Sequence, residues 1–301
     1  AERLLVEALK YVEQAKQLGN PDSVIALHDL AQNGLLSDVV HYSNGIQAGD
    51  SSNYVRYIWE QPKSAVWEFH QTTVNNTVHF GGLDSVLRWE KGNGSFWRYV
   101  TERLGDGGQK AWVRGTEYHR SRGLAVSATG KINVTQYMGS FWNDSVLGLV
   151  PKNDHELEAI LSFCSSSDFE CEVRKVDQKL NVRSAVTKVA FDYEHWSKVA
   201  EEQYPNGLPQ PYTNDPTQWI FHGHPCGSVI WDEDKKWTAV AQKRTDDTVL
   251  QVAVARLLGY RWPAELDEEM ELADEMLHWL AKSDNLLKLQ DDDGIVCLPA
   301  L

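Results

Sequence analysis

Long apolar runs are absent from this sequence of 301 residues, in which no stretch reaches about 18 consecutive apolar residues. A helix that crosses a bilayer needs about 20 of them, so no membrane-spanning segment is expected. The first residues, Ala1 to Leu5, also lack the charged-then-apolar pattern of a secretion signal. They are typical of the interior of a helix, which suggests a chain cut from a longer protein.

Cysteines are few, and no two of them form a C-x-x-C pair. The four are Cys164, Cys171, Cys226 and Cys297. In a chain of this length, such irregular spacing favours reduced thiols over a disulfide framework. The sequence therefore predicts a cytoplasmic protein.

The signatures of metal binding and of nucleophilic catalysis are incomplete. His222, His224 and Cys226 could be three metal ligands, but tetrahedral zinc needs a fourth, usually from a second pair at similar spacing. The other cysteines lie far away in sequence, so no metal is expected. The sequence also contains no G-x-S-x-G motif of a serine hydrolase and no P-D…E-x-K arrangement of a nuclease.

Acidic residues outnumber basic ones, and the formal net charge of −14 argues against nucleic acid as a partner. The charge is unevenly distributed, however. Residues 191–301 hold 21 acids and 9 bases, whereas residues 41–140 hold 8 acids and 11 bases. This central segment carries a small positive charge, so the overall acidity does not exclude a DNA-binding surface there.

The spacing of apolar residues changes along the chain. Helical spacing predicts helices over 2–18 and 22–33. From 37 to 149, short alternating runs are separated by Gly, Asn and Asp turn residues, a pattern that predicts β-strands. The expected strands are 53–59, 65–69, 77–80, 86–89, 123–127 and 147–150.

Helical spacing returns in the second half. A helix over 153–180 should break at the serine run 165–168, where Ser167 or Asp168 caps its second part. A strand over 185–191 and a helix over 193–202 should follow. The remaining expected elements are a hairpin that includes 229–231, helices over 248–258 and 268–282, and an edge strand over 294–298.

These elements predict an α+β fold in three parts. A helical lead-in over 1–40 precedes a β-rich domain over 41–150, and a mainly helical C-terminal domain covers 151–301.

Three separated stretches resemble a known family. They run from Ser43 to Glu60, from Val176 to Val182 and from Asn206 through Pro225. Similar stretches occur in the same order in the C-terminal part of fused type II restriction–modification methylases and related BREX-type phage-defence methylases. Both groups are N6-adenine DNA methyltransferases. The similarity covers the chain from about Asn44 to its C-terminus.

In that family, a G-[IL]-Q-x-G-D segment follows the methylase core and begins the target recognition domain. The corresponding residues here are Gly45 to Asp50, and the motif continues to Glu60. The resemblance implies that the β-rich part recognises specific sequences in double-stranded DNA. It also implies an upstream methyltransferase domain of the same polypeptide, which binds S-adenosylmethionine.

The catalytic signature of the family is missing from this sequence. Its N-P-P-[YF] motif supplies an amide that accepts from the adenine amino group and a ring that stacks on the flipped base. The stretch from Pro209 to Tyr212 has the tyrosine but neither the adjacent prolines nor the amide. Phe80 to Gly82 has glycines, but lies in a β-rich stretch and not between a strand and a helix. No cofactor is therefore expected in this chain, which should be inactive as an enzyme alone.

A recognition domain reads bases with side chains that match base edges, Arg or Lys for guanine and Asn or Gln for adenine. The β-rich segment offers basic, amide and hydroxyl side chains, many of them in expected loops, and two lysines follow further on. The candidate DNA-binding residues are Gln47, Asn53, Arg56, Gln71, Thr72, Thr73, Arg98, Arg114, Arg120, Arg122, Lys131, Lys175 and Lys179. Any one alone is more readily an ordinary surface residue, whereas the set and the resemblance together favour DNA contact.

Two of these assignments leave alternatives open. Arg56 could contact phosphate or pair with a carboxylate such as Glu60. Lys175 and Lys179 are spaced i, i+4 on an expected helix, where they could hold phosphate or form part of a solvated face.

The tryptophans and the acidity also fit other classes of protein. Most of the 12 tryptophans lie at core spacing, but Trp97 and Trp112 stand beside Gly-rich loops and could offer exposed stacking faces. A carbohydrate-binding or carbohydrate-active protein is therefore the alternative function. A scaffold that docks a protein partner through its acidic C-terminal helices is a third.

Overall fold

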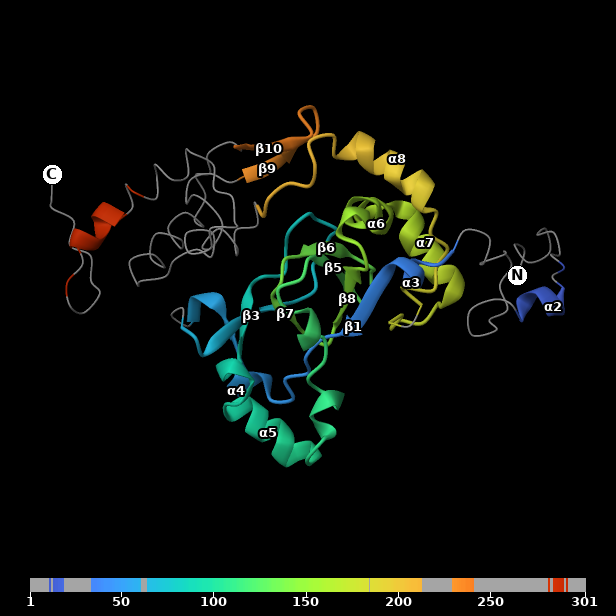
Figure 1. Ribbon diagram of the computed structural model, residues 1–301. Coiled ribbons are helices and arrows are strands. Elements are labelled where there is room, and N and C mark those ends of the chain that lie inside the picture. The colour runs from blue at the N-terminus through green and yellow to red at the C-terminus, as the bar shows by residue number, and fades with distance from the viewer. Residues whose placement is uncertain are drawn as a thin grey trace, which may run out of the picture.

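The computed structural model (Figure 1) describes residues 11, 13–18, 34–60, 64–183, 185–212, 229–240, 281, 284–289 and 291. Helices and mostly antiparallel sheets occur together within them, which confirms the predicted α+β class. No helix in these ranges is both long and apolar enough to cross a bilayer. The elements predicted at 22–33, 248–258 and 294–298 lie outside this part of the chain, as does nearly all of the helix predicted over 268–282.

An antiparallel sheet of four strands lies near the centre of Figure 1. Its strand order is β1 (Val40–Asn44), β8 (Val146–Pro151), β5 (Gly123–Ser127) and β6 (Val134–Tyr137). The two inner strands, β8 and β5, are buried along their whole length. Both are short continuous runs of small and branched residues, the pattern expected of a strand covered on both faces.

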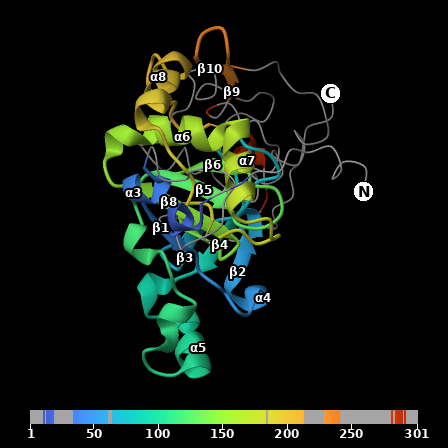
Figure 2. The ribbon, with the colours of Figure 1, turned by 90° about the vertical axis from the view of Figure 1, so that its right-hand side faces the viewer.

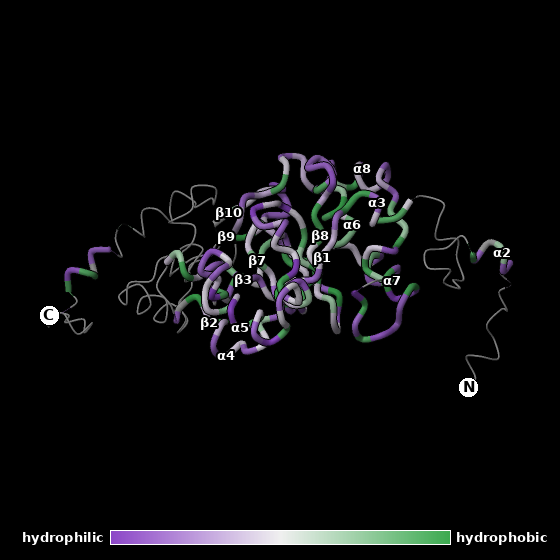
Figure 3. Tube along the Cα trace, turned by 60° about the horizontal axis from the view of Figure 1, so that its bottom comes forward, coloured by the Kyte–Doolittle hydropathy of each residue, from purple (hydrophilic) through white to green (hydrophobic). Residues whose placement is uncertain are grey.

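Three helices lie to one side of this sheet, as Figures 1 and 2 both show. They are α6 (Leu157–Ser165), α7 (Ser167–Val176) and α8 (Tyr193–Gln203). Figure 3 colours much of α6 and of the neighbouring strand β8 as hydrophobic. Ser166 caps α7, because its hydroxyl accepts from the backbone N–H of Phe169 at 3.4 Å. The cap is thus Ser166 itself, within the predicted break and just before the two residues expected.

A single hydrophobic core joins the sheet to the helices. It contains Leu124 and Leu149 of the strands together with Ile160 and Phe163 of α6, all at most 2 % exposed. The same cluster continues to Phe191, just before α8. The boundary predicted between residues 150 and 151 therefore runs through a shared core.

A second sheet of four short strands lies beside the first. Its order is β2 (Val55–Tyr57), β4 (Ser85–Arg88), β3 (Trp67–Gln71) and β7 (Phe141–Trp142), and only β3 and β7 run parallel. Helix α5 (Ser95–Leu104) extends from this region at the bottom of Figure 1. Phe96 and Val100 of α5, one turn apart, are fully buried in a separate small core with Leu87 and Phe141.

Short elements complete the described chain. The small helices are α2 (Gln14–Gln17), α3 (Leu36–Val39) and α4 (Ser51–Tyr54), and the hairpin comprises β9 (Val229–Asp232) and β10 (Trp237–Val240). The 3-10 turns are η2 (Ile58–Glu60), η3 (Glu90–Gly92), η4 (Gly108–Ala111), η5 (Thr116–Tyr118), η6 (Asp154–Glu156) and η7 (Asn285–Leu289).

Two predicted strands are wrong, and helices α3, α4 and α5 were not predicted. Residues 185–191 form turns, in which Ala185, Val186 and Thr187 are consecutively buried instead of alternating between two faces. Residues 77–80 carry no strand. Helix α5 stands where strands and turns alone were expected. Its aromatic residues are compatible with either element, and the flanking glycines suggested turns.

Candidate functional site

The segment Gly45 to Asp50, which carries the strongest part of the resemblance, is held in place by the main chain. The backbone N–H of Ile46 donates to the Trp142 carbonyl at 2.7 Å, and that of Gln47 donates to the Trp112 carbonyl at 2.8 Å. Ile46 also pairs with Asn143 as an isolated parallel bridge. The segment therefore lies against the end of β7 in a defined register.

Both glycines of this segment are required by its surroundings. A Cβ atom on Gly45 would lie 2.1 Å from the backbone oxygen of Asn143. Gly49 has φ +70°, and a Cβ atom there would lie 2.3 Å from the Trp112 ring. Neither position can hold another residue without movement of its neighbours, which gives the two glycines of the motif a physical reason.

Asp50 organises the turn that follows. One carboxylate oxygen accepts from the Ser52 hydroxyl at 2.6 Å and the other accepts from the Asn53 amide at 2.6 Å. These side-chain hydrogen bonds hold the pKa of Asp50 below its usual value. Asn53 is exposed, but its amide is used to fix the turn.

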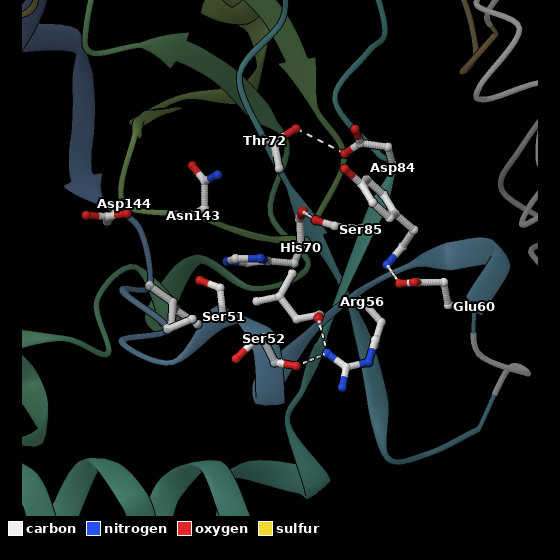
Figure 4. Close-up of a pocket in the computed structure, with 14 residues that line it drawn as sticks. Ser51, Ser52, Arg56, Glu60, His70, Thr72, Asp84, Ser85, Asn143 and Asp144 are labelled. Carbon is white, nitrogen blue, oxygen red and sulfur yellow. Dashed lines mark hydrogen bonds between the residues drawn. The ribbon is translucent and has the colours of Figure 1, made fainter.

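A polar pocket of about 470 Å³ opens beside the segment (Figure 4). One wall comes from residues 46–60, a second from β3 and the start of β4, and a third from the turn after β7. The lining residues are Ile46, Ala48, Ser51, Ser52, Val55, Arg56, Tyr57, Glu60, His70, Thr72, Asp84, Ser85, Asn143 and Asp144. Volumes of about 300–1,000 Å³ are typical of sites that hold small ligands.

His70 is a buried polar residue of this pocket. It is 3 % exposed, and neither ring nitrogen has a hydrogen-bond partner of acceptable geometry among the described residues. Burial lowers the pKa of His70 to about 4, with only the Ile46 backbone acting in the opposite direction. The imidazole is therefore uncharged at neutral pH.

Arg56 contributes a guanidinium to the pocket, but does not pair with Glu60. It donates to the backbone carbonyls of Ser52 and Val55, the latter at 2.8 Å. Glu60 instead accepts from the backbone N–H of Tyr57 at 2.8 Å. Of the two alternatives, the ion pair with Glu60 is thus wrong, and phosphate contact stays a prediction.

Two further arginines meet near the Asn143–Asp144 turn. Arg114 donates to the Gly45 carbonyl at 3.2 Å, and Arg183 pairs with Asp144 at 3.8 Å. Partial burial and the charge of Arg183 lower the pKa of Arg114, while Asp144 opposes them. Arg183 was not among the predicted contacts, because it lies 39 residues beyond Asp144 and nothing local distinguishes it.

Basic side chains differ between the two halves of the described chain. In residues 41–140, one group of exposed cations forms no ion pair with any described residue. These are Lys91, Arg98, Arg103, Lys110, Arg120, Arg122 and Lys131.

Several cations of the second half have carboxylate partners close in sequence. The pairs are Lys175–Glu172 at 2.5 Å, Lys198–Glu194 at 3.7 Å, Lys235–Asp232 at 3.1 Å and Lys236–Glu233 at 2.7 Å. Among the described residues, exposed cations without an ion pair are therefore more numerous in residues 41–140 than in the second half.

The structure contradicts the prediction for Gln71. Its side chain is 1 % exposed, and its amide donates to the carbonyls of Gly81 at 2.8 Å and Gln136 at 2.9 Å. An amide that uses both hydrogens inside the fold cannot also read a base edge. Its neighbour Thr72 lines the pocket and donates to Asp84 at 3.1 Å, whereas Thr73 is exposed and Gln47 is half-buried.

Lys175 and Lys179 do not form the predicted helical pair. Helix α7 ends at Val176, so Lys179 lies in the turn beyond it. The Lys179 carbonyl accepts from Arg174 at 2.6 Å, and Lys175 is paired with Glu172. The two lysines therefore share no helix face.

The tryptophan predictions are also corrected. Trp97 and Trp112 are partly buried against the small core around Phe96, and the ring of Trp112 packs 6.2 Å from that of Tyr99. Both rings are therefore partly covered by the protein. His222, His224 and Cys226 lie outside the described residues, and no group of potential ligands for a metal ion occurs within them.

A cluster around His79 joins the β-rich part to the chain that follows α8. One ring nitrogen of His79 shares a hydrogen bond with the Tyr212 hydroxyl and the other with that of Tyr204, the second at 3.1 Å. The Trp231 ring lies 4.8 Å away, edge-on. Burial lowers the pKa of His79 to about 4, against the opposing charge of Glu233. Tyr212, considered above only as part of an incomplete catalytic motif, is thus a structural partner.

Comparison with known proteins gives little further information. No family model and no curated protein matches the chain. Among solved structures, the chain is similar to MmeI, a Type IIL restriction-modification enzyme in complex with DNA. The TM-score is 0.34 at 14 % identity, over 67 % of this chain and 28 % of that enzyme. A TM-score this low does not establish a shared fold.

Proposed function

We propose that this chain recognises specific sequences in duplex DNA on behalf of an adenine-specific (N6) DNA methyltransferase of a restriction–modification or phage-defence system. The observation that carries the proposal is the group of exposed, unpaired cations in residues 41–140, the range that also contains the segment that carries the resemblance. Phosphate contacts by such side chains supply most of the affinity of a protein for DNA. Lysines already paired with acidic residues, as in the hairpin β9–β10, are less suited to this role.

Recognition and chemistry are assigned to different parts of the polypeptide. The proposed upstream methyltransferase domain would bind S-adenosylmethionine and the flipped adenine, because this sequence contains neither an N-P-P-[YF] motif nor a cofactor loop. The described residues would set the register of the duplex through phosphate contacts and select the sequence through base contacts.

The chain alone should transfer no methyl group. Incubation of the 301-residue protein with radiolabelled S-adenosylmethionine and mixed-sequence duplex DNA is expected to leave the DNA unlabelled, since the residues that orient the adenine amino group are missing. Scintillation counting of the recovered DNA is the measurement. Incorporation above a no-enzyme blank would show that this chain contains an active site, which would contradict the division of roles.

Removal of two free cations should weaken DNA binding. The double variant Arg120→Ala, Arg122→Ala is expected to bind all duplexes about tenfold less tightly. It should also lower the salt dependence of binding by about two units, one for each phosphate contact. Fluorescence anisotropy at two salt concentrations measures both quantities. The main chain at Arg120 already has φ 72°, and alanine leaves that conformation as it is.

A matched control is available in the hairpin β9–β10. Lys235→Ala with Lys236→Ala removes the same amount of charge, but from side chains already paired with Asp232 and Glu233. Binding should change little. If the hairpin variant loses affinity while the Arg120, Arg122 variant keeps it, the DNA lies on the other half of the molecule and the assignment of the β-rich part fails.

A further inference from the structure

Helix α5 projects from the rest of the described chain. Figures 1 and 2, which are turned by 90° from each other, both show it at the bottom of the view, away from α6, α7 and α8. Its ten residues extend about 15 Å. An α-helix with its side chains is about 10–12 Å wide, close to the width of about 12 Å of the major groove of B-DNA. The size and position of α5 therefore suit insertion into that groove.

The two faces of α5 differ in character. Phe96 and Val100, one turn apart, are fully buried in the small core with Leu87. At about 3.6 residues per turn, Arg98 and Glu102 lie on the opposite side of the helix, and both are exposed. The helix thus presents one basic and one acidic side chain, again one turn apart, on the face that the core leaves uncovered.

Arg98 and Glu102 do not pair with each other, although their spacing allows an ion pair. Side chains four residues apart on a helix are neighbours, and Lys198 and Glu194 of α8 form such a pair at 3.7 Å. Neither Arg98 nor Glu102 forms an ion pair or a side-chain hydrogen bond with a described residue. Within the described part of the chain, this guanidinium and this carboxylate are therefore not engaged.

Hydrogen bonds fix both ends of α5. At its N-terminus, the Glu90 carboxylate accepts from the backbone N–H of Ser95 at 2.5 Å and from the Ser95 hydroxyl at 2.7 Å. Near its C-terminus, the Gln109 amide donates to the Thr101 hydroxyl at 2.9 Å. With one face in the core and both ends held, the exposed face has a defined orientation, which selective contact with bases requires.

The charge around α5 is suited to DNA. Residues 91–110 hold four bases and two acids, and the four bases belong to the exposed cations without an ion pair. Lys91 precedes the helix and Arg103 lies in its last turn, where contacts with phosphates would set its position in the groove. Glu102 would be repelled by a phosphate, whereas at the floor of the major groove a carboxylate can accept from the cytosine amino group.

We propose that α5 enters the major groove of the bound duplex, where Arg98 contacts guanine and Glu102 contacts cytosine one or two base pairs away. Arginine donates to O6 and N7 of guanine, and glutamate accepts from N4 of cytosine. Residues four apart are about 6 Å apart along the helix axis, close to two base-pair steps. The inference rests on the proposed function and goes beyond it, because it assigns sequence selection to one face of one helix.

The test measures sequence preference as well as affinity. The 301-residue protein is mixed with duplexes randomised over a central segment, and the bound fraction is sequenced after repeated selection. Arg98→Ala should lose a guanine preference at one position and bind the selected duplex about tenfold less tightly. Glu102→Gln should replace a preference for cytosine, within two positions of that guanine, by one for adenine, because a glutamine amide pairs with adenine.

A matched control lies on α8. Lys198 and Glu194 are also four residues apart on a helix, and their side chains are 72 % and 87 % exposed. Lys198→Ala and Glu194→Gln make the same kinds of change outside residues 41–140, so neither should alter the sequence preference. Because all four substituted residues are exposed, each variant should keep the thermal transition of the unmodified chain.

The outcomes distinguish this inference from the proposed function. Changes of preference confined to Arg98→Ala and Glu102→Gln support base reading by α5. If these variants bind every duplex more weakly with an unchanged preference, or bind as the unmodified chain does, the inference is overturned and DNA recognition still stands. A changed preference in the α8 variants also overturns it. If the unmodified chain selects no sequence, the proposed function fails together with the inference.

Discussion

Acidification from pH 7 to pH 4 is expected to reduce the free energy of unfolding by up to about 6 kcal/mol. His70 and His79 each have a pKa of about 4 in the folded chain, whereas an unfolded histidine titrates near 6.5. Between these values the unfolded state binds more protons, so stability rises with pH there and falls as the pH is lowered. Each histidine contributes about 3 kcal/mol at pH 4 by this linkage.

The two histidines resist protonation for related structural reasons. His70 is enclosed between the walls of the pocket, without a carboxylate partner in the described chain. His79 lies between the hydroxyls of Tyr204 and Tyr212, and Glu233 offsets part of the effect of burial. A protonated ring donates from both nitrogens and can accept no hydrogen bond. The tyrosine hydroxyl that donates to the neutral ring would then have to accept a hydrogen bond instead.

Denaturant unfolding at pH 7, 5.5 and 4 measures this loss. The His70→Phe variant should lose only about half as much stability over the same range, because one of the two titrating groups is gone. His79→Gln provides the reciprocal comparison. A free energy of unfolding that stays constant from pH 7 to pH 4.5 would mean that both histidines titrate normally, contrary to the burial described here.

Gly45→Ala is expected to destabilise the protein by about 3 kcal/mol. The added methyl group would lie 2.1 Å from the Asn143 backbone oxygen and 2.2 Å from that of Trp142. Backbone atoms cannot turn aside as a flexible side chain can, so the Gly45–Asp50 segment must separate from β7. One wall of the pocket moves with it, and DNA affinity should fall together with stability.

Gly107→Ala is the matched control for the loss of a glycine. Gly107 has the left-handed φ of +84°, and nothing lies within 4 Å of an added Cβ atom, so the cost is the backbone strain of about 1 kcal/mol. Chemical denaturation of both variants separates a clash from a conformational preference. Equal stability of the two variants would show that the Gly45 segment is not packed as closely against β7 as described.

Local patterns in the sequence predicted the regular elements with strong periodicity. Strand β5 has the predicted bounds, and α8 begins at Tyr193 after the Asp192 cap, whose carboxylate accepts from the His195 N–H at 3.0 Å. The break between α6 and α7 also lies in the serine run. Helix α5 was missed because its aromatic residues have no strong local preference for helix or strand. The helix is stabilised by the burial of Phe96 and Val100 against residues distant in the sequence, which local patterns do not reveal.

The residues of the candidate site were harder to predict from the sequence than the secondary structure. Residue type suggested Gln71 as a base-reading amide, but tertiary hydrogen bonds to Gly81 and Gln136 occupy it. His70 meets the Gly45 segment, and Arg183 meets Asp144, through contacts between residues distant in the chain. No local pattern encodes such contacts, so the sequence could suggest the kinds of side chains involved and not which of them converge.

The shared core has a consequence for the exchange of specificity between related proteins. A graft that carried residues 41–150 alone would remove Leu124 and Leu149 from Ile160 and Phe163, and would leave His79 without Tyr204 and Tyr212. Both the donor fragment and the recipient would then expose apolar surface. The smallest exchangeable unit is better placed from Gly34, whose carbonyl accepts from the Phe191 N–H, through Tyr212. Recombination between related genes would keep the shared core intact only if the junctions lay near Gly34 and Tyr212.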